Sequence, residues 1–327
     1  MDAIENAQGA KVCLTTYIYG EKYQGYIPFL VYSCHKAYPE YDIVLFLHEK
    51  MSLSVKESLD IIGAANVIIK ENAFADCPHM NSLKAKCLRW VLWDDVFCQY
   101  DYLYVVDIDM LYIREPILLH EQHCRHMSTT GLCYDNLVRI KTRHPFRRIS
   151  FGQRFKHAGF RSFFKFLLGS RKDYRLSGLH FIQVKPYYEK LTKETRDQLR
   201  KKIYDGSYQR LFMSCNNETF LYYMVKEYGM TPERLAVQSD PCKSLDFNDC
   251  TRPEFRPHHG IHLGIFRTDM HGKNDAILDS QVYDFYIQSF KKEIVTDSVY
   301  WALYDQAMPE IQALFENFHD YFQIQRP

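Results

Sequence analysis

Two carboxylates at the end of an apolar run are the residues whose types and spacing are best suited to chemistry. The segment 102–110 reads YLYVVDIDM, so β-forming residues lead directly into Asp107 and Asp109. Because a strand turns alternate side chains to opposite faces, carboxylates two residues apart leave it on the same side. Such hard oxygen ligands suit Mg²⁺ or Mn²⁺, which commonly bridge to substrate phosphates. The motif therefore predicts a metal site that holds a nucleotide diphosphate.

The alternative is that these are ordinary surface-turn carboxylates. An Asp-x-Asp triplet is expected about once by chance in a chain of this size, so the triplet alone is a weak signal. It occurs only once here, however, and it follows a strand that reads as buried. That context favours the metal site.

Composition indicates a folded globular protein. With 46% hydrophobic and 15% aromatic residues, the 327 residues can form one large core, or a core with an appendage. The formal net charge of +1 excludes bulk electrostatic attraction as the main binding principle and argues against nucleic acid as a partner. No apolar stretch has the length of a membrane span, and the first residues lack a signal-peptide core.

Cysteine usage points to a reducing compartment. The ten cysteines are scattered singly, and none forms a Cys-x-x-Cys pair, so neither a zinc site nor a small disulfide framework is indicated. Several lie in apolar runs, where a reduced cysteine behaves as a small hydrophobic residue. We therefore expect a cytoplasmic protein.

The elements that must position the two carboxylates alternate between strand and helix. Strands are expected before the Asp-x-Asp strand at 11–19, 41–48 and 66–70. The intervening helices are expected at 26–35, 54–62 and 81–93. This order predicts an α/β fold with a mainly parallel sheet flanked by helices on both faces. Ligands of such sheets bind at the carboxyl ends of the strands, where Asp107 and Asp109 lie.

The second half of the chain completes the sheet and adds helices. A further strand is expected at 179–184, followed by a helix from near Pro186. Another helix is expected to follow Asn216-Asn217-Glu218, and the chain beyond residue 282 reads as aromatic-rich helices. We therefore expect one domain over residues 1–275 and a helical C-terminal extension over residues 276–327.

Residues 139–175 break this pattern with a basic, aromatic segment. It contains twelve Lys or Arg residues against one acidic residue, Asp173, with seven phenylalanines interleaved. A solvated basic loop is one reading. Exposed phenylalanines are unfavourable in a solvated loop, however. The other interpretation is therefore that the segment contacts an anionic membrane surface or a polyanion.

Several segments together resemble the GT-A fold glycosyltransferases of family 8, the group that includes glycogenin and bacterial lipopolysaccharide galactosyltransferases. The segments, which follow the family's order between residues 11 and 268, are Leu14-Thr15-Thr16-Tyr17 with Tyr23, residues 81–93, Tyr104–Asp109, Ser177-Gly178 and His262-Leu263-Gly264. The resemblance implies a GT-A fold and metal-dependent transfer of a hexose from a UDP-sugar. The acceptor would be a glycan or lipid-linked, and the configuration would be retained.

The resemblance also implies residue roles. The nucleoside would be held by Thr15, Thr16, Tyr17 and Tyr23. Mn²⁺ or Mg²⁺ would be held by Asp107, Asp109 and His262, with Asp107 also on the ribose side. The donor would further meet Lys86, Ser177, Gly178, Gly264 and Arg267, of which Lys86 and Arg267 would stabilise the leaving diphosphate.

The chain departs from the family pattern in three places. The late histidine is separated from its glycine by one residue instead of two, and His258 and His259 remain alternatives to His262. Arg267 stands where the family has lysine, although arginine binds phosphate with bidentate geometry. The family's Asp-Gln pair on the acceptor side is absent, and Asn216-Asn217-Glu218 occupies that region.

Glu218 and Asn217 are thus the candidate catalytic residues. A carboxylate at a helix N-terminus is favoured in its ionised form, which suits binding a sugar hydroxyl or stabilising positive charge. Alternatively, Glu218 is a helix-capping residue without catalytic duty. If it acted as a general base, inversion of configuration would be expected.

Two rival functions stay open at this stage. A sugar nucleotidyltransferase also combines an α/β fold with acidic metal ligands, but Tyr19-Gly20-Glu21-Lys22 is a poor substitute for a glycine-rich phosphate loop. A non-enzymatic protein that binds lipid or polyanion through residues 139–175 is the other.

Overall fold

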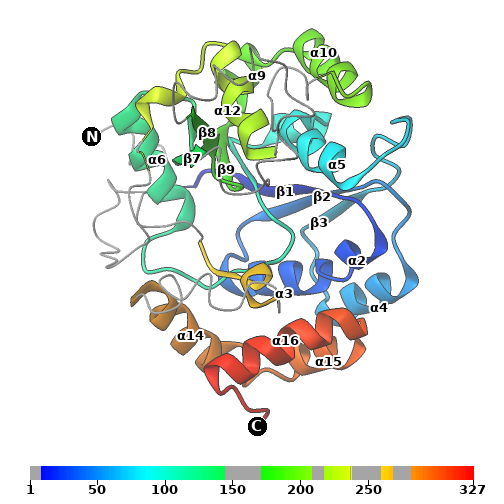
Figure 1. Ribbon diagram of the computed structural model, residues 1–327. Helices are drawn as coiled ribbons and strands as arrows, with labels where there is room; N and C mark the ends of the chain where they lie inside the picture. Colours follow the sequence, from blue (N-terminus) through cyan, green and yellow to red (C-terminus); the bar gives the residue numbers. More distant parts are fainter. Residues whose placement is uncertain (1–8, 144–170, 208–216, 236, 238–258, 268–280) are drawn as a thin grey trace, which may run out of the picture.

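A computed structural model describes residues 9–143, 171–207, 217–235, 237, 259–267 and 281–327 (Figure 1). Four features of the sequence analysis therefore lie outside the described residues. They are Asn216, His258, the central part of the basic aromatic segment, and the boundary between residues 275 and 276.

A six-stranded sheet forms the centre of the molecule, with strand order β3-β2-β1-β4-β9-β6. Its parallel strands are β1 (Val12–Ile18), β2 (Asp42–Leu47), β3 (Val67–Lys70) and β4 (Tyr102–Val105). The antiparallel neighbours are β9 (His180–Gln183) and β6 (Tyr134–Asp135). The prediction of a mainly parallel α/β sheet is confirmed.

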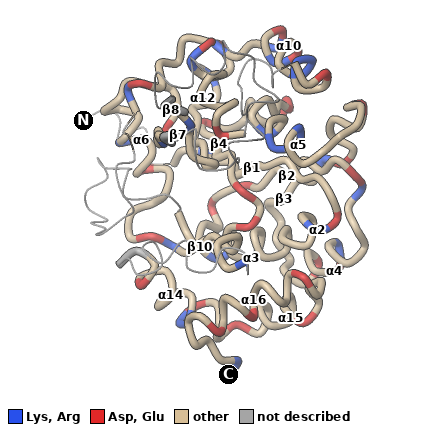
Figure 2. The backbone as a smooth tube through the Cα atoms, viewed as in Figure 1, with Lys and Arg blue, Asp and Glu red and all other residues tan. Residues whose placement is uncertain are grey.

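Helices cover both faces of this sheet (Figure 1). One side carries α3 (Ile27–Ala37), α4 (Leu53–Ile62), α14 (Gln281–Glu293), α15 (Ser298–Gln306) and α16 (Pro309–Phe322), with α2 (Glu21–Gln24) near the sheet edge. The other carries α5 (Ser82–Leu88), α9 (Val184–Lys190), α10 (Lys193–Tyr204) and α12 (Asn217–Glu227). Helix α6 (Leu119–Thr130) leads into β6. Figure 2 shows basic and acidic positions of both signs spread over these helices.

The two faces have separate cores because strand β1 alternates. Val12, Leu14 and Ile18 pack with the C-terminal helices and α3. Cys13 and Tyr17 face the opposite way, toward α5, α9 and α12. The C-terminal helices share the first core, where the rings of Phe29 and Phe315 lie 4.5 Å apart. Burial of apolar surface on both faces is the main stabilising term of such a sheet.

Two small sheets position the site. Strands β5 (Met110–Leu111) and β10 (Ile261–His262) pair antiparallel, with His262 opposite Met110. Strands β7 (Val138–Arg143) and β8 (Arg171–Leu176) form the antiparallel base of the basic aromatic segment.

The Asp-x-Asp strand is shorter than predicted, and this changes the explanation of the motif. Strand β4 ends at Val105, and Asp107 and Asp109 lie in the connection to β5. The backbone N–H of Val106 donates to the Thr15 carbonyl at 3.0 Å, after which the chain leaves the sheet to pair with β10. Strand alternation therefore does not set the directions of the two carboxylates.

The helix predicted at 81–93 is also shorter. The Asn81 side chain caps it by accepting from the N–H groups of Leu83 and Lys84, as a preferred N-cap residue does. The α-helix ends at Leu88 and continues as the 3₁₀-helix η1 (Arg89–Val91). This tighter turn places Arg89 and Trp90 in buried positions. Among the described residues, no helix combines the length and apolar character needed to cross a bilayer.

Candidate active site

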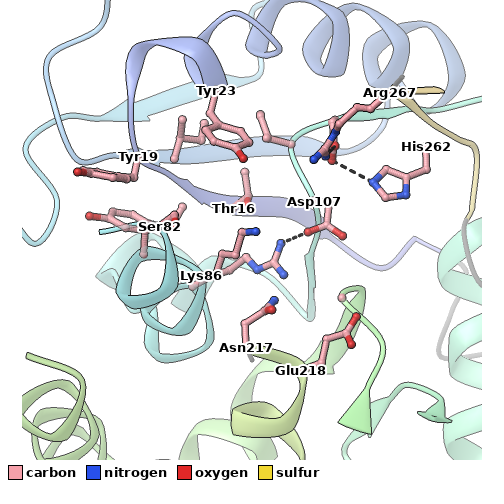
Figure 3. A pocket seen from close by; sticks show the side chains of 17 residues that line it. Thr16, Tyr19, Tyr23, Ser82, Lys86, Asp107, Asn217, Glu218, His262 and Arg267 are labelled. Carbon is pink, nitrogen blue, oxygen red and sulfur yellow. Dashed lines mark hydrogen bonds and ion pairs between the residues drawn. The ribbon is translucent and has the colours of Figure 1, made fainter. Parts of the chain in front are cut away.

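A pocket lies at the carboxyl ends of β1 and β4, as the strand order predicts (Figure 3). Its walls come from β1, α2, α5, the β4–β5 connection, α12 and the segment that includes β10. The sequence-predicted residues that line it are Thr16, Tyr17, Tyr23, Lys86, Asp107, Asp109, Gly178, Asn217, Glu218, His262 and Arg267.

Three predicted residues lie behind the pocket walls. Thr15 is fully buried, and its hydroxyl donates to the Val44 carbonyl at 2.7 Å, so it ties β1 to β2. Ser177 and Gly264 are buried next to lining residues. These three residues therefore support the residues that line the pocket and do not line it themselves.

Asp109 is the most enclosed carboxylate of the pocket. Its Oδ1 lies 3.2 Å from His262 Nε2, and its Oδ2 accepts from Arg267 Nη2 at 3.1 Å. Burial by itself raises the pKa of Asp109, but the charge and hydrogen bond of His262, together with Arg267, outweigh it and hold the pKa well below its usual range. Asp109 is thus an ionised, oriented oxygen donor.

Gly264 makes this arrangement sterically possible. A Cβ atom at this position would lie 2.5 Å from Asp109 Oδ2, 2.7 Å from Arg267 Nη2 and 2.9 Å from His262 Nε2. No other residue type leaves that space, so Gly264 serves the site by close backbone approach.

Asp107 has a different partner, which sequence reasoning missed. The Arg89 guanidinium forms an ion pair with Asp107 through Nη1, and the same Nη1 donates to the Val106 carbonyl at 3.1 Å (Figure 3). Arg89 lies over the Trp90 ring, 4.2 Å from its centroid. The available sequence signal was its position three residues after Lys86, because residues at that spacing share a helix face.

The turn at Gly178 is built by a second residue that sequence reasoning missed. The Asn136 side chain accepts from the Ser177 N–H at 2.7 Å and donates to the Leu179 carbonyl at 2.8 Å. This holds Gly178 against Asp107, where a Cβ would lie 2.7 Å from Oδ2. Sequence offers no signal for Asn136, since it is 41 residues away from Ser177.

Of the two candidate histidines that the structure describes, it brings His262 to the carboxylates. His259 is buried elsewhere, with Nδ1 lying 3.2 Å from Glu115 Oε1 and its ring beside His123. Burial lowers the pKa of His262, but the Asp109 carboxylate overcomes this and raises it above the ordinary value. The Asp109 carboxylate therefore favours the protonated form of His262, and a metal ion that binds this imidazole competes with the proton.

Glu218 and Asn217 enter the pocket from the side opposite His262 and Arg267 (Figure 3). Both belong to the first turn of α12. Glu218 is paired with arginines of the β7–β8 hairpin, with Oε1 3.3 Å from Arg139 Nη1 and Oε2 3.8 Å from Arg175 Nη1. The base of the basic aromatic segment is thereby tied to this wall.

Tyrosine rings form another wall of the pocket, near Ser82 (Figure 3). The Tyr17 hydroxyl lies 2.9 Å from His48 Nδ1 and donates to the Ala73 carbonyl at 3.1 Å. Tyr19, which sequence reasoning did not assign, packs edge-on to His48 with centroids 5.2 Å apart. An apolar wall with fixed polar atoms suits a nucleobase or a sugar.

The donor chemistry of the pocket fits a divalent cation, although no preformed cluster of three such ligands occurs in the described parts of the chain. Two carboxylates and an imidazole are ligands that Mn²⁺ accepts. Each carboxylate is now neutralised by an arginine, Asp107 by Arg89 and Asp109 by Arg267. A metal that binds Asp109 would take the place of the positive charge of Arg267.

A larger cavity, of 590 Å³, lies at the amino ends of the parallel strands. It is lined by the first residues of β1 and β2 and by Glu40 and Glu121. None of the predicted site residues borders it, and parallel sheets bind ligands at the carboxyl ends of their strands. The pocket beside Asp107 and Asp109 is therefore the candidate site.

Comparison with known proteins gives matches in structure only. No protein-family model and no curated protein sequence matches the chain. The fold is similar to the mannosyltransferase Ktr4p from S. cerevisiae in complex with GDP, at 9% identity and a TM-score of 0.45, over 71% of this chain and 70% of that chain.

Two further solved structures are also glycosyltransferases. Core-mannan synthase A from Aspergillus fumigatus, in its Mn/GDP form, has 8% identity and a TM-score of 0.40, over 66% of this chain and 69% of that chain. The galactosyltransferase LgtC, in complex with donor and acceptor sugar analogues, has 12% identity and a TM-score of 0.41, over 90% and 99% of the two chains. Similarity at this level concerns the path of the chain and bears on neither substrate nor mechanism.

Proposed function

We propose that this protein is a metal-dependent glycosyltransferase that moves a hexose from a UDP-sugar to a glycan or lipid-linked acceptor. One observation carries the proposal. A single pocket at the carboxyl ends of the strands contains an ionised carboxylate with an imidazole on one side, and Asn217 with Glu218 on the other. Group transfer needs such an arrangement of residues. One side of the pocket can bind the anionic diphosphate, and the facing side can bind the hydroxyl groups of the sugar or acceptor.

The donor would lie along the tyrosine wall and the cationic side chains. Tyr17, Tyr19 and Tyr23 offer rings for the uridine, and Lys86 and Arg267 offer positive charge for the diphosphate. Arg89 supports the same assignment, because its Nε and Nη2 have no hydrogen-bond partner among the described residues and it lines the pocket. Buried donors without a partner favour an oxygen-rich ligand.

Mn²⁺ or Mg²⁺ would be held by Asp109, His262 and one oxygen of Asp107. When bound, the metal supplies positive charge against the diphosphate as the sugar leaves. Asp109 is positioned for this by His262 and by the Leu263 N–H, which donates to the Asp109 carbonyl at 2.8 Å. His262 would bind the metal only in its neutral form, so the Asp109–His262 pair couples metal binding to pH.

Glu218 is proposed to orient a sugar or acceptor hydroxyl and to stabilise developing positive charge at the sugar. Its two carboxylate oxygens each face an arginine of the β7–β8 hairpin. That geometry supports an orienting role over general-base catalysis, because neither oxygen is left exclusively to an attacking hydroxyl. It thus supports retention of configuration, as the sequence resemblance implies.

The basic aromatic segment is proposed to contact the acceptor or an anionic membrane that carries it. Arg139 and Arg175, at the two ends of the segment, reach the acceptor-side Glu218. A phosphorylated or lipid-linked acceptor would account for the twelve basic residues and the interleaved phenylalanines together.

The test is a screen of sugar nucleotides for metal-dependent hydrolysis and transfer, read by mass spectrometry. We expect release of UDP and free hexose from one UDP-sugar, which stops when the metal is chelated. Formation of a sugar nucleotide from a sugar phosphate and a nucleoside triphosphate would instead identify a nucleotidyltransferase. Lipid or polyanion binding without turnover of any sugar nucleotide would identify a binding protein.

A further inference from the structure

Asp107 and Asp109 are paired with two arginines that differ in exposure. The Arg89 side chain is 6% exposed, whereas the Arg267 side chain is 49% exposed. Their carboxylate partners differ in the opposite sense, with Asp107 30% exposed and Asp109 8% exposed. A buried cation therefore holds the more open carboxylate, and a half-exposed cation holds the enclosed one.

Three contacts fix Arg89 in place. Its Nη1 is shared between the Asp107 carboxylate and the Val106 carbonyl, which belong to the same connection. Its guanidinium lies over the Trp90 ring at 4.2 Å from the centroid, a cation–π arrangement. Moving this side chain would break all three contacts and would place a charge against the apolar core around Trp90.

Among the described residues, Arg267 has no anchorage comparable to that of Arg89. Its Nη2 donates a hydrogen bond of 3.1 Å to Asp109 Oδ2, and half of its side chain faces solvent. A divalent cation that approaches Asp109 can therefore displace Arg267 into solvent, because the cation itself supplies the positive charge that the enclosed carboxylate needs.

We propose that Arg89 is a positioning residue that keeps one oxygen of Asp107 occupied, so that only Oδ2 of Asp107 is offered to the metal. This inference rests on the proposed metal-dependent function. It assigns the metal's main protein contacts to Asp109 and His262 and makes Asp107 a one-oxygen ligand. Gly178 supports it, because only a residue without a Cβ leaves Oδ2 accessible at that wall.

Arg89 has a second effect, which is electrostatic. A fixed positive charge beside Asp107 opposes the binding of a cation in the absence of an anionic ligand. The metal alone should therefore bind weakly, and a diphosphate that brings negative charge should strengthen its binding. If the Arg89 charge is removed, the metal alone should bind more tightly.

The experiment titrates the protein with Mn²⁺ alone and measures free Mn²⁺ by electron paramagnetic resonance. Arg89→Met should bind Mn²⁺ about tenfold more tightly than wild type. Arg89→Lys keeps the charge and should stay within about threefold of wild type. Combining Arg89→Met with Asp107→Asn should abolish the gain, since the released oxygen is then no longer a carboxylate.

The outcomes separate the inference from the function on which it rests. If wild type binds Mn²⁺ and folded Arg89→Met binds it equally or more weakly, the role of Arg89 is overturned while the metal-dependent function stands. If wild type binds no Mn²⁺ with or without UDP, the metal-dependent function fails and the inference fails with it.

A second comparison covers the case in which Arg89→Met does not fold. With Arg89 intact, Asp107→Asn should lower Mn²⁺ affinity less than Asp109→Asn, because Asp107 offers a single oxygen. The reverse ranking would overturn the proposal. If Arg89 had only a structural role, its replacement would change the unfolding midpoint and leave Mn²⁺ affinity unchanged.

Discussion

His262 Nε2 lies 3.2 Å from Asp109 Oδ1, although the two residues are separated by 153 positions in the chain. The antiparallel pairing of β5 with β10 creates this contact, because it sets His262 opposite Met110, the residue that follows Asp109. The Leu263 N–H then donates to the Asp109 carbonyl. The candidate metal site is therefore held by backbone pairing as well as by side-chain charge.

The Asp109 carboxylate should be indispensable for metal-dependent nucleotide binding. Asp109→Asn keeps the shape of the side chain but removes the charge that balances His262 and Arg267. We expect the variant to fold and to lose Mn²⁺-dependent binding of UDP in calorimetry. Asp305→Asn, which alters an exposed ion pair with Arg326, is the matched control and should bind normally. Unchanged binding by Asp109→Asn would sink the assignment.

His262 should make metal binding dependent on pH. The Asp109 carboxylate raises the pKa of His262 above its ordinary value of 6.5, despite the lowering effect of burial. The protonated form, which cannot bind metal, therefore persists to higher pH, and Mn²⁺ affinity should start to fall while the pH is still above about 6.5. Titrations at several pH values should show this loss in wild type.

The same titrations distinguish between the histidines. His262→Ala should weaken Mn²⁺ binding and flatten its pH dependence, whereas His259→Ala should leave both nearly unchanged, because His259 is paired with Glu115. A stronger effect from His259→Ala would move the metal site to that residue. His258, which lies outside the described residues, completes the set.

Gly264 should not tolerate even a methyl group. In Gly264→Ala, the new Cβ would lie 2.5 Å from Asp109 Oδ2, so the carboxylate must shift. We expect a loss of about 1–3 kcal/mol in the free energy of unfolding, together with loss of Mn²⁺ and UDP binding. Gly206→Ala is a useful control, because Gly206 has φ +73° but open space around it. It should lower stability by about 1 kcal/mol and leave ligand binding intact.

Acid should destabilise the C-terminal helices through His319. Burial lowers the pKa of His319 to about 4, and the Tyr300 hydroxyl lies 2.8 Å from its Nε2. Since the folded pKa is below the unfolded value of about 6.5, stability is complete above that pH and is lost as the pH falls toward 4. The loss attributable to His319 is on the order of 3 kcal/mol.

Chemical unfolding between pH 7 and pH 4 measures this effect. His319→Gln removes the titrating group, so its stability should fall less steeply over this range than that of wild type. The remaining slope is expected from His123 and His180, whose pKa values burial also lowers, to about 4 and about 3 respectively. His35→Asn changes an exposed histidine and should follow wild type. Equal slopes for His319→Gln and wild type would contradict the prediction.

Residues 139–175 should confer salt-sensitive binding to anionic vesicles. Each basic residue near an anionic surface contributes about 1 kcal/mol, and inserted phenylalanines add apolar burial. Replacement of Arg147, Arg148, Arg154 and Lys156 by serine should abolish flotation with such vesicles and leave UDP affinity unchanged. Wild-type protein that stays free of anionic vesicles at low salt would refute the membrane contact.

The sequence by itself determined the mainly parallel sheet and the position of the site at the carboxyl ends of its strands. Alternation of short apolar runs with amphipathic segments specifies strand and helix locally, and the handedness and layering of β-α-β units leave few ways to assemble them. Asp107 and Asp109 could therefore be placed at the carboxyl ends of the strands from sequence. Asn81 was likewise readable as the start of α5, because capping depends on the next few residues only.

Only the tertiary structure decided which partners these residues have. The pairing of Asp107 with Arg89 depends on where α5 tightens into a 3₁₀ turn, and that of Glu218 with Arg139 depends on the packing of α12 beside the β7–β8 hairpin. Likewise, sequence left three histidines as candidates, and the β5–β10 register selected His262 over the buried His259. The physical reason is that side-chain partnership is set by long-range packing and burial, which local propensity and spacing do not encode.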